Sequence, residues 1–224
     1  MVPPSLDAAL LVLTIVSLVG AVFFSLTYPN VILEQGMSHR IFYFHVPVAW
    51  IALYGPILSS IFSILYLWKK KYIFDSLAFT SNQLALVFSI GVLFSGPIWA
   101  FSAWGVPWDR TDARLQSFFI LCVSLLTYFI FRYLIDNIRK RAIISAYLSL
   151  LCAISSILTW GAIRWIENPG NHPGSVLGKG GMDADMRLSF WISVFSFHLL
   201  FLVFFVVAYR FQKLQNLRQN LKWE

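Results

Sequence analysis

Long apolar runs alternate with short polar segments along the whole chain, and six of the runs are long enough to cross a bilayer. A membrane-spanning helix needs about 20 mostly apolar residues. The predicted spans are Ala8–Thr27, Ile41–Leu67, Gln83–Phe101, Leu115–Leu134, Ala142–Ile163 and Leu188–Tyr209. The pattern therefore predicts an all-α polytopic membrane protein with six transmembrane helices joined by short loops.

The composition supports a membrane protein and argues against a soluble one. Of the 224 residues, 58% are hydrophobic and only 12% are charged, whereas about a quarter of an ordinary globular chain is charged. A soluble fold of this size could not cover so much apolar surface. The segment Met1–Asp7 lacks the basic start of a signal peptide, so the first run is expected to be a retained span. We expect one domain, residues 1–224.

The lysines and arginines predict the orientation of the six spans. Eleven lie on one side of the predicted membrane and six on the other, and the side with more of them is expected to be cytoplasmic. Both termini are then cytoplasmic, and the outer loops are Pro29–Arg40, Ser102–Arg114 and Arg164–Arg187. The eleven inner residues are Lys69, Lys70, Lys71, Arg132, Arg139, Lys140, Arg141, Arg210, Lys213, Arg218 and Lys222.

Cys122 and Cys152 both fall inside apolar runs and lack a C-x-x-C spacing. They are interpreted as small buried hydrophobic residues rather than as a disulfide or a metal site.

An outer segment concentrates tryptophan and charge in an otherwise apolar chain. Trp99, Trp104 and Trp108 lie within ten residues of one another, and DRTDARL follows directly. Such rings stack on a large planar ligand, and arginines pair with its anionic edge. Asp112 is placed to cap the fourth span, which Arg114 begins. The alternatives are that the tryptophans anchor the chain at the interface and that Asp112 and Arg114 are only a cap and an interface charge.

Two histidines are predicted on the same outer face. His45 begins the second span, where the positive end of the helix favours a neutral imidazole able to bind metal. His172 lies in the third outer loop, within ENPGNHPGS. Their separation does not fit a local zinc motif, whereas six-coordinate haem iron accepts two axial histidines. His39 is a reserve ligand. His198, inside the sixth span, is either functional or a buried residue hydrogen-bonded to a neighbouring helix.

These segments resemble the CcmC family of haem-handling membrane proteins of cytochrome c biogenesis. SGPIWAFSAWGVPWDRTDARLQS is similar to the family's tryptophan-rich WWD segment, here about residues 99–117 between the third and fourth spans. EQGMSHRIFYFHVPVAW is similar to its Q-G-x-x-x-R-I-x-Y-x-H-V-P-A-A stretch, and NHPGS to its last-loop histidine segment.

The resemblance implies a site for haem b. It implies that His45 and His172 are the axial ligands of the haem iron. The family motif holds one residue fewer, so both Asp109 and Asp112 are candidate counterparts of its aspartate, although DARL favours Asp112. The positions expected to carry the haem are Trp99, Trp104, Gly105, Trp108, Asp112, Arg114 and Leu115.

The resemblance also implies a function, which is haem delivery rather than catalysis. The chain would present haem at the outer face of a bacterial inner membrane, or of an organellar inner membrane, and pass it to a CcmE-like haem chaperone. Its other partners would be a CcmD-like small membrane protein and the ABC transporter CcmA/CcmB. Two alternatives remain: a haem-positioning subunit of a cytochrome c synthase, and a haem-free transporter whose aromatic loop lies at the interface.

Overall fold

The protein is a bundle of six long helices. The computed structural model describes residues 4–30, 36–167 and 181–220. All six helices are long and apolar enough to cross a membrane, which confirms the predicted number of spans, and the described residues contain no strand. The elements are α1 (Pro4–Thr27), the 3-10 helix η1 (Met37–Ile41), α2 (Phe42–Lys69), α3 (Tyr72–Trp104), α4 (Ala113–Leu134), α5 (Ile138–Trp165) and α6 (Ala184–Asn220).

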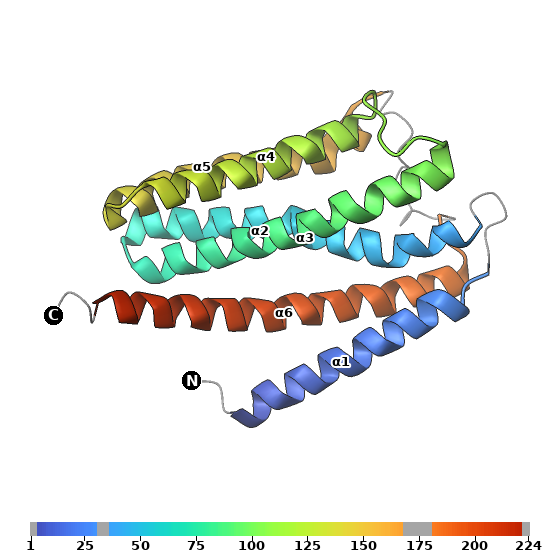
Figure 1. Cartoon of the computed structure of the whole chain (residues 1–224), viewed down its shortest axis with the longest axis horizontal. Helices are drawn as coiled ribbons and strands as arrows, with labels where there is room; N and C mark the ends of the chain where they lie inside the picture. Colours follow the sequence, from blue (N-terminus) through green and yellow to red (C-terminus); the bar gives the residue numbers. More distant parts are fainter. Residues whose placement is uncertain (1–3, 31–35, 168–180, 221–224) are drawn as a thin grey trace.

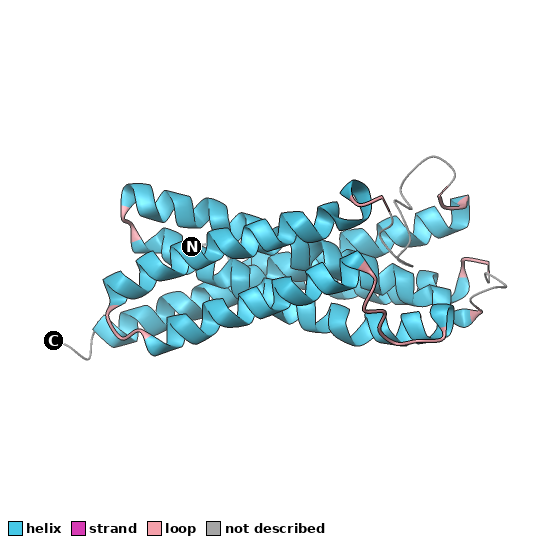
Figure 2. Cartoon of the chain, turned by 90° about the horizontal axis from the view of Figure 1, so that it is seen from above, coloured by secondary structure: helices cyan, strands magenta, loops and turns pink. Residues whose placement is uncertain are grey.

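The helices lie roughly along one direction, and successive helices run in opposite senses (Figures 1 and 2). The start of α1 and the end of α6 lie at the same end of the bundle as the α2–α3 and α4–α5 turns (Figure 1). The turn between α3 and α4 lies at the opposite end, as does the start of α2 (Figure 1). This second end therefore gathers the tryptophan-rich segment and His45.

The core lies between α2, α3, α4 and α5, while α1 packs on α6 at the edge of the bundle (Figure 1). Small residues bring α2 and α3 close together: a Cβ added at Gly55 would lie 2.8 Å from Cβ of Ala85. Close approach of this kind drives helix association where lipid removes the hydrophobic incentive. Cys122 and Cys152 are buried, unpaired members of this core, as predicted.

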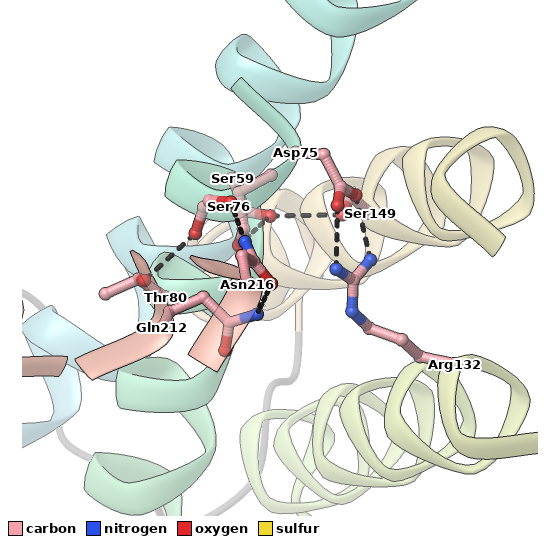
Figure 3. A network of polar contacts seen from close by, with 9 residues as sticks. Ser59, Asp75, Ser76, Thr80, Arg132, Ser149, Gln212 and Asn216 are labelled. Carbon is pink, nitrogen blue, oxygen red and sulfur yellow. Dashed lines mark hydrogen bonds and ion pairs between the residues drawn. The ribbon is translucent and has the colours of Figure 1, made fainter. Parts of the chain in front are cut away.

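Polar side chains connect the helices inside the bundle (Figure 3). Asn82 donates to the Ser149 hydroxyl at 3.0 Å, and the Ser149 and Ser59 hydroxyls lie 3.0 Å apart. Ser59 donates in turn to the carbonyl of Ala78 at 2.8 Å. The direction of these bonds follows because the last acceptor is a carbonyl. The chain of bonds ties α2, α3 and α5 together.

The start of α3 corrects the sequence prediction. We expected the third span to begin at Gln83, but α3 begins at Tyr72. The polar residues before Gln83 suggested a loop, yet they are satisfied within the bundle. Asp75 accepts two hydrogen bonds of 2.8 Å from Arg132 of α4, and Ser76 accepts one of 3.3 Å from Asn216 of α6 (Figure 3). A helix can carry polar groups into a membrane when neighbouring helices pair with them.

Candidate functional site

His45 lies in the first turns of α2, with its ring held by α3. Its Nδ1 lies 2.8 Å from the Ser95 hydroxyl. That hydroxyl donates its single proton to the carbonyl of Gly91 at 2.8 Å, so it accepts from His45. Nδ1 of His45 therefore carries the proton, and Nε2 keeps a free lone pair. A histidine that binds metal is held in this way by a partner on its other nitrogen.

Gly96 leaves room for the His45 ring. A Cβ added there would lie 3.3 Å from Cε1 of the imidazole, which is closer than most real contacts of a Cβ atom. Ser95 and Gly96 were not singled out from the sequence, because they lie about 50 residues from His45 and no local pattern links them. Only the packing of α2 on α3 reveals their role.

The face of α3 that holds the His45 ring also carries Trp99, and Trp104 follows at the end of the helix. Trp99 lies four residues after Ser95, so the two side chains share one side of the helix. The Trp99 and Trp104 rings meet edge to face, with centroids 5.1 Å apart. Both rings are half-buried. The structure thus brings Trp99 and His45 to one region near the C-terminal end of α3.

Trp108 packs against α4. Its ring meets Phe119 edge to face at 6.3 Å. The segment 99–117 is also less of a loop than its sequence suggests, because α3 continues to Trp104 and α4 begins at Ala113. The turn between them starts at Gly105, whose positive φ of 77° ends α3 and whose amide donates to the carbonyl of Phe101.

Asp112 caps α4, which confirms the prediction from the sequence. Its carboxylate accepts from the amides of Arg114 and Leu115, both at 3.0 Å, and the residue is fully buried. Asp109 does not cap the helix. Its carboxylate accepts hydrogen bonds from the amide and the hydroxyl of Thr111, which stabilise the turn before α4. Both aspartates order this segment, and the cap fixes the backbone from which Arg114 projects.

Arg114 extends from α4 toward the outer end of α5. Its Nη2 lies 3.5 Å from the carbonyl of Trp160, while its buried Nε has no hydrogen-bond partner. The guanidinium lies close enough to His45 for the two groups to interact electrostatically. An unsatisfied buried donor on a cation suits an anionic ligand. The structure thus brings together His45, Trp99 and Arg114, from three helices.

The remaining histidines have different surroundings. His172 lies outside the described residues. His39 is buried in η1, where Nδ1 bonds the carbonyl of Gly36 and Nε2 has no partner. His198 is half-buried, packs on Tyr54 and bonds the carbonyl of Val194 within its own helix α6, instead of the neighbouring helix that we considered from the sequence.

A hollow of about 490 Å³ lies at the start of α6. It is lined by Ala184, Arg187, Leu188 and Trp191, mostly with apolar atoms. Trp191 also meets Trp50 of α2, so the hollow borders the helix that carries His45. Its volume falls in the range of small-molecule sites.

Comparison with known proteins identifies the family. The chain matches the family described as "Heme exporter protein C" over residues 2–224. It is 26% identical over 204 residues to heme exporter protein C of Rhodobacter capsulatus, covering 88% of this chain and 82% of that one. It is 28% identical over 169 residues to heme exporter protein C of Escherichia coli K12, which cover 75% of this chain and 67% of the relative.

A plant relative extends the comparison. A putative cytochrome c biosynthesis ccmC-like mitochondrial protein of Arabidopsis thaliana is 26% identical over 205 residues, which cover 91% of this chain and 77% of the relative. Because the family match covers nearly the whole sequence, the six-helix chain belongs to the CcmC family of heme exporter proteins.

Proposed function

We propose that this membrane protein holds haem b at its outer face and delivers it for cytochrome c maturation. Membership of the CcmC family supports a role in haem handling. The observation that carries the proposal is the hydrogen bond that His45 Nδ1–H donates to the Ser95 hydroxyl, because it leaves Nε2 unprotonated and able to bind a metal. In this arrangement His45 and His172 would hold the haem iron through their imidazoles.

The residues around His45 suit a porphyrin. Trp99 and Trp104 offer aromatic surface beside the imidazole, and Arg114 offers a guanidinium to an anionic edge. Gly105, Trp108, Asp112 and Leu115 shape or border the same turn. When bound, haem supplies an iron centre that accepts both imidazoles. The chain's own residues then hold and orient the cofactor and catalyse no reaction on it.

The proposed setting is a bacterial inner membrane with the haem site on the periplasmic face, or the equivalent face of an organellar inner membrane. A CcmE-like haem chaperone would receive the haem there. A CcmD-like small membrane protein and the ABC transporter CcmA/CcmB complete the proposed set of partners. A site at one end of the bundle gives a water-soluble acceptor domain access to the cofactor.

The test is the absorption spectrum of the purified protein, expressed with ample haem. We expect a Soret band with sharp low-spin α and β bands in the wild type. His45→Ala and His172→Ala should each shift the spectrum toward a high-spin form, because each removes one axial imidazole. His198→Ala is the matched control and should leave it unchanged. An unaltered six-coordinate spectrum in both ligand variants would overturn the ligand assignment.

A further inference from the structure

We infer that Arg164, at the outer end of α5, acts with Arg114 as a two-guanidinium site for the two carboxylates of the bound porphyrin. The inference rests on the proposed function and adds a ligand contact to it. Arg164 is absent from the motif segments and was counted in the sequence only as an outer charge. The geometry of the ends of α4 and α5 assigns it this role.

Arg114 and Arg164 converge on one backbone oxygen. Nη1 of Arg164 donates to the carbonyl of Trp160 at 2.7 Å, and Nη2 of Arg114 lies 3.5 Å from the same oxygen. The two guanidinium groups are near enough to repel each other electrostatically. Arg164 is exposed and Arg114 is half-buried, and a carbonyl oxygen carries only part of a negative charge, so both groups can offer donors to an anion beside them.

The ion pairs found among the described residues involve other arginines. Within the described part of the chain, ion pairs form at Arg132 and Arg210 but at neither Arg114 nor Arg164. Asp112 attracts Arg114, yet one of its carboxylate oxygens accepts the two backbone amides at the start of α4. The buried Nε of Arg114 also remains without an acceptor.

Aromatic rings hold Arg164 in position. Its guanidinium lies 4.2 Å from the centroid of the Trp160 ring, and Trp165 meets that ring edge to face at 6.1 Å. Gly161 makes room for the Trp165 ring, since a Cβ at position 161 would lie only 2.2 Å from Cε3 of Trp165. A stacked guanidinium loses less freedom when it binds a carboxylate, because its plane is already fixed.

The placement also suits a single ligand that reaches His45. Arg114 lies within electrostatic range of both His45 and Arg164, so one large ligand could reach all three groups. Haem carries its two propionate carboxylates on one edge, away from the iron. With the iron at His45, that edge would meet Arg114 and Arg164, each of which matches a carboxylate with two parallel donors.

A structural explanation makes a different prediction. Trp160 lies near the end of α5, where cations stabilise unpaired carbonyls and the negative end of the helix dipole. If the two arginines served only this purpose, replacing them would lower thermal stability without regard to the ligand's carboxylates. The experiment must therefore vary the ligand as well as the protein.

We would measure binding of haem and of haem dimethyl ester, whose propionates are blocked, to the full-length protein in nanodiscs. Arg164→Gln and Arg114→Gln should each weaken haem binding about tenfold, the scale of one charge-assisted hydrogen bond. Neither should change binding of the ester. Arg164→Lys should bind haem more tightly than Arg164→Gln, since lysine keeps the positive charge but lacks the two parallel donors of a guanidinium. Arg110→Gln, in the same outer turn, is the matched control and should bind both porphyrins normally.

The outcomes separate the two levels of the proposal. Equal losses for haem and its ester, or no loss in Arg164→Gln, would overturn the carboxylate site while leaving haem binding intact. A loss in Arg110→Gln as large as in Arg164→Gln would also overturn it, because the contact would then be general charge attraction. A wild-type protein that binds neither porphyrin would overturn the proposed function, and this inference with it.

Discussion

At the scale of single residues, the end of the bundle opposite the termini contains a relay of two hydrogen bonds that fixes the His45 ring. Gly91 accepts from Ser95, and Ser95 accepts from His45, so a backbone carbonyl of α3 fixes the protonation of an imidazole on α2. The relay leaves Nε2 of His45 unprotonated and therefore able to bind a metal ion. The Ser95 hydroxyl is thus a positioning group for His45.

Replacing Ser95 by alanine tests this relay. Ser95→Ala should lower haem affinity by about tenfold or more. Removing the hydrogen-bond partner of the ring nitrogen that does not bind the metal typically lowers metal affinity by about that factor. Ser95→Thr keeps the hydroxyl and should retain most of the affinity. Titrating haem into the purified variants and following the Soret band measures both. The matched control is Ser124→Ala, which removes a similar hydroxyl bonded to the carbonyl of Ile120 on α4; an affinity as low in this control would point to a general packing defect.

The residue scale also shows what the sequence can reveal. The cap at Asp112 was predictable because capping depends on residues two and three positions ahead. The role of Ser95 was not predictable, since its partner His45 lies on another helix. Arg164 was visible only as a charge, because its pairing with Arg114 depends on the packing of α5 against α4. Contacts between residues close in the sequence, such as a helix cap, can be predicted from the sequence. Contacts between residues on different helices require knowledge of how the helices pack.

At the scale of elements, polar pairs decide where the helices begin. The third helix starts eleven residues earlier than expected, at Tyr72 instead of Gln83. Hydropathy placed its start after the cluster of polar residues, which in the folded bundle face Ser149, Asn216 and Arg132. The existence of six spans followed from apolar length alone. Their ends did not, because a polar residue inside a span looks the same in the sequence as one in a loop.

The ion pair between Asp75 and Arg132 provides the test at this scale. The two side chains are only 12% and 8% exposed and form two parallel hydrogen bonds. Asp75→Ala or Arg132→Ala should lower the free energy of unfolding by about 3 to 5 kcal/mol, because each leaves a buried charge unpaired. The double variant Asp75→Leu/Arg132→Leu should lose less than either single variant. Unfolding in mixed detergent micelles would measure the differences.

A second ion pair serves as the control for the first. Arg210 and Asp7 join α6 to α1 at 2.6 Å, but their side chains are 43% and 35% exposed. Asp7→Ala should therefore cost much less stability than Asp75→Ala, since solvent screens exposed charges. Similar losses at both pairs would show that helix joining, and not burial of charge, sets the stability of these contacts.

At the scale of the whole molecule, the arrangement of the helices gives each end of the bundle a distinct character. An even number of spans returns the chain to its starting face, and Figure 1 places the beginning of α1 and the end of α6 together. The opposite end collects His45, Trp99, Arg114 and Arg164 from four different helices. A site of this kind needs α2, α3, α4 and α5 assembled, so binding and folding of the bundle are linked.

The orientation of the bundle decides which compartment this site faces. Eleven lysines and arginines accompany the end that holds the termini and six accompany the other, so we expect the termini inside and the site outside. In a protein with Cys122 and Cys152 replaced, a cysteine at Val106 or Asp136 would report on each end, since both positions are exposed turns. Val106→Cys should react with an impermeant maleimide on intact bacterial spheroplasts, whereas Asp136→Cys should react only after the membrane is opened. The reverse pattern would turn the site toward the cytoplasm, where a periplasmic acceptor could not reach the haem.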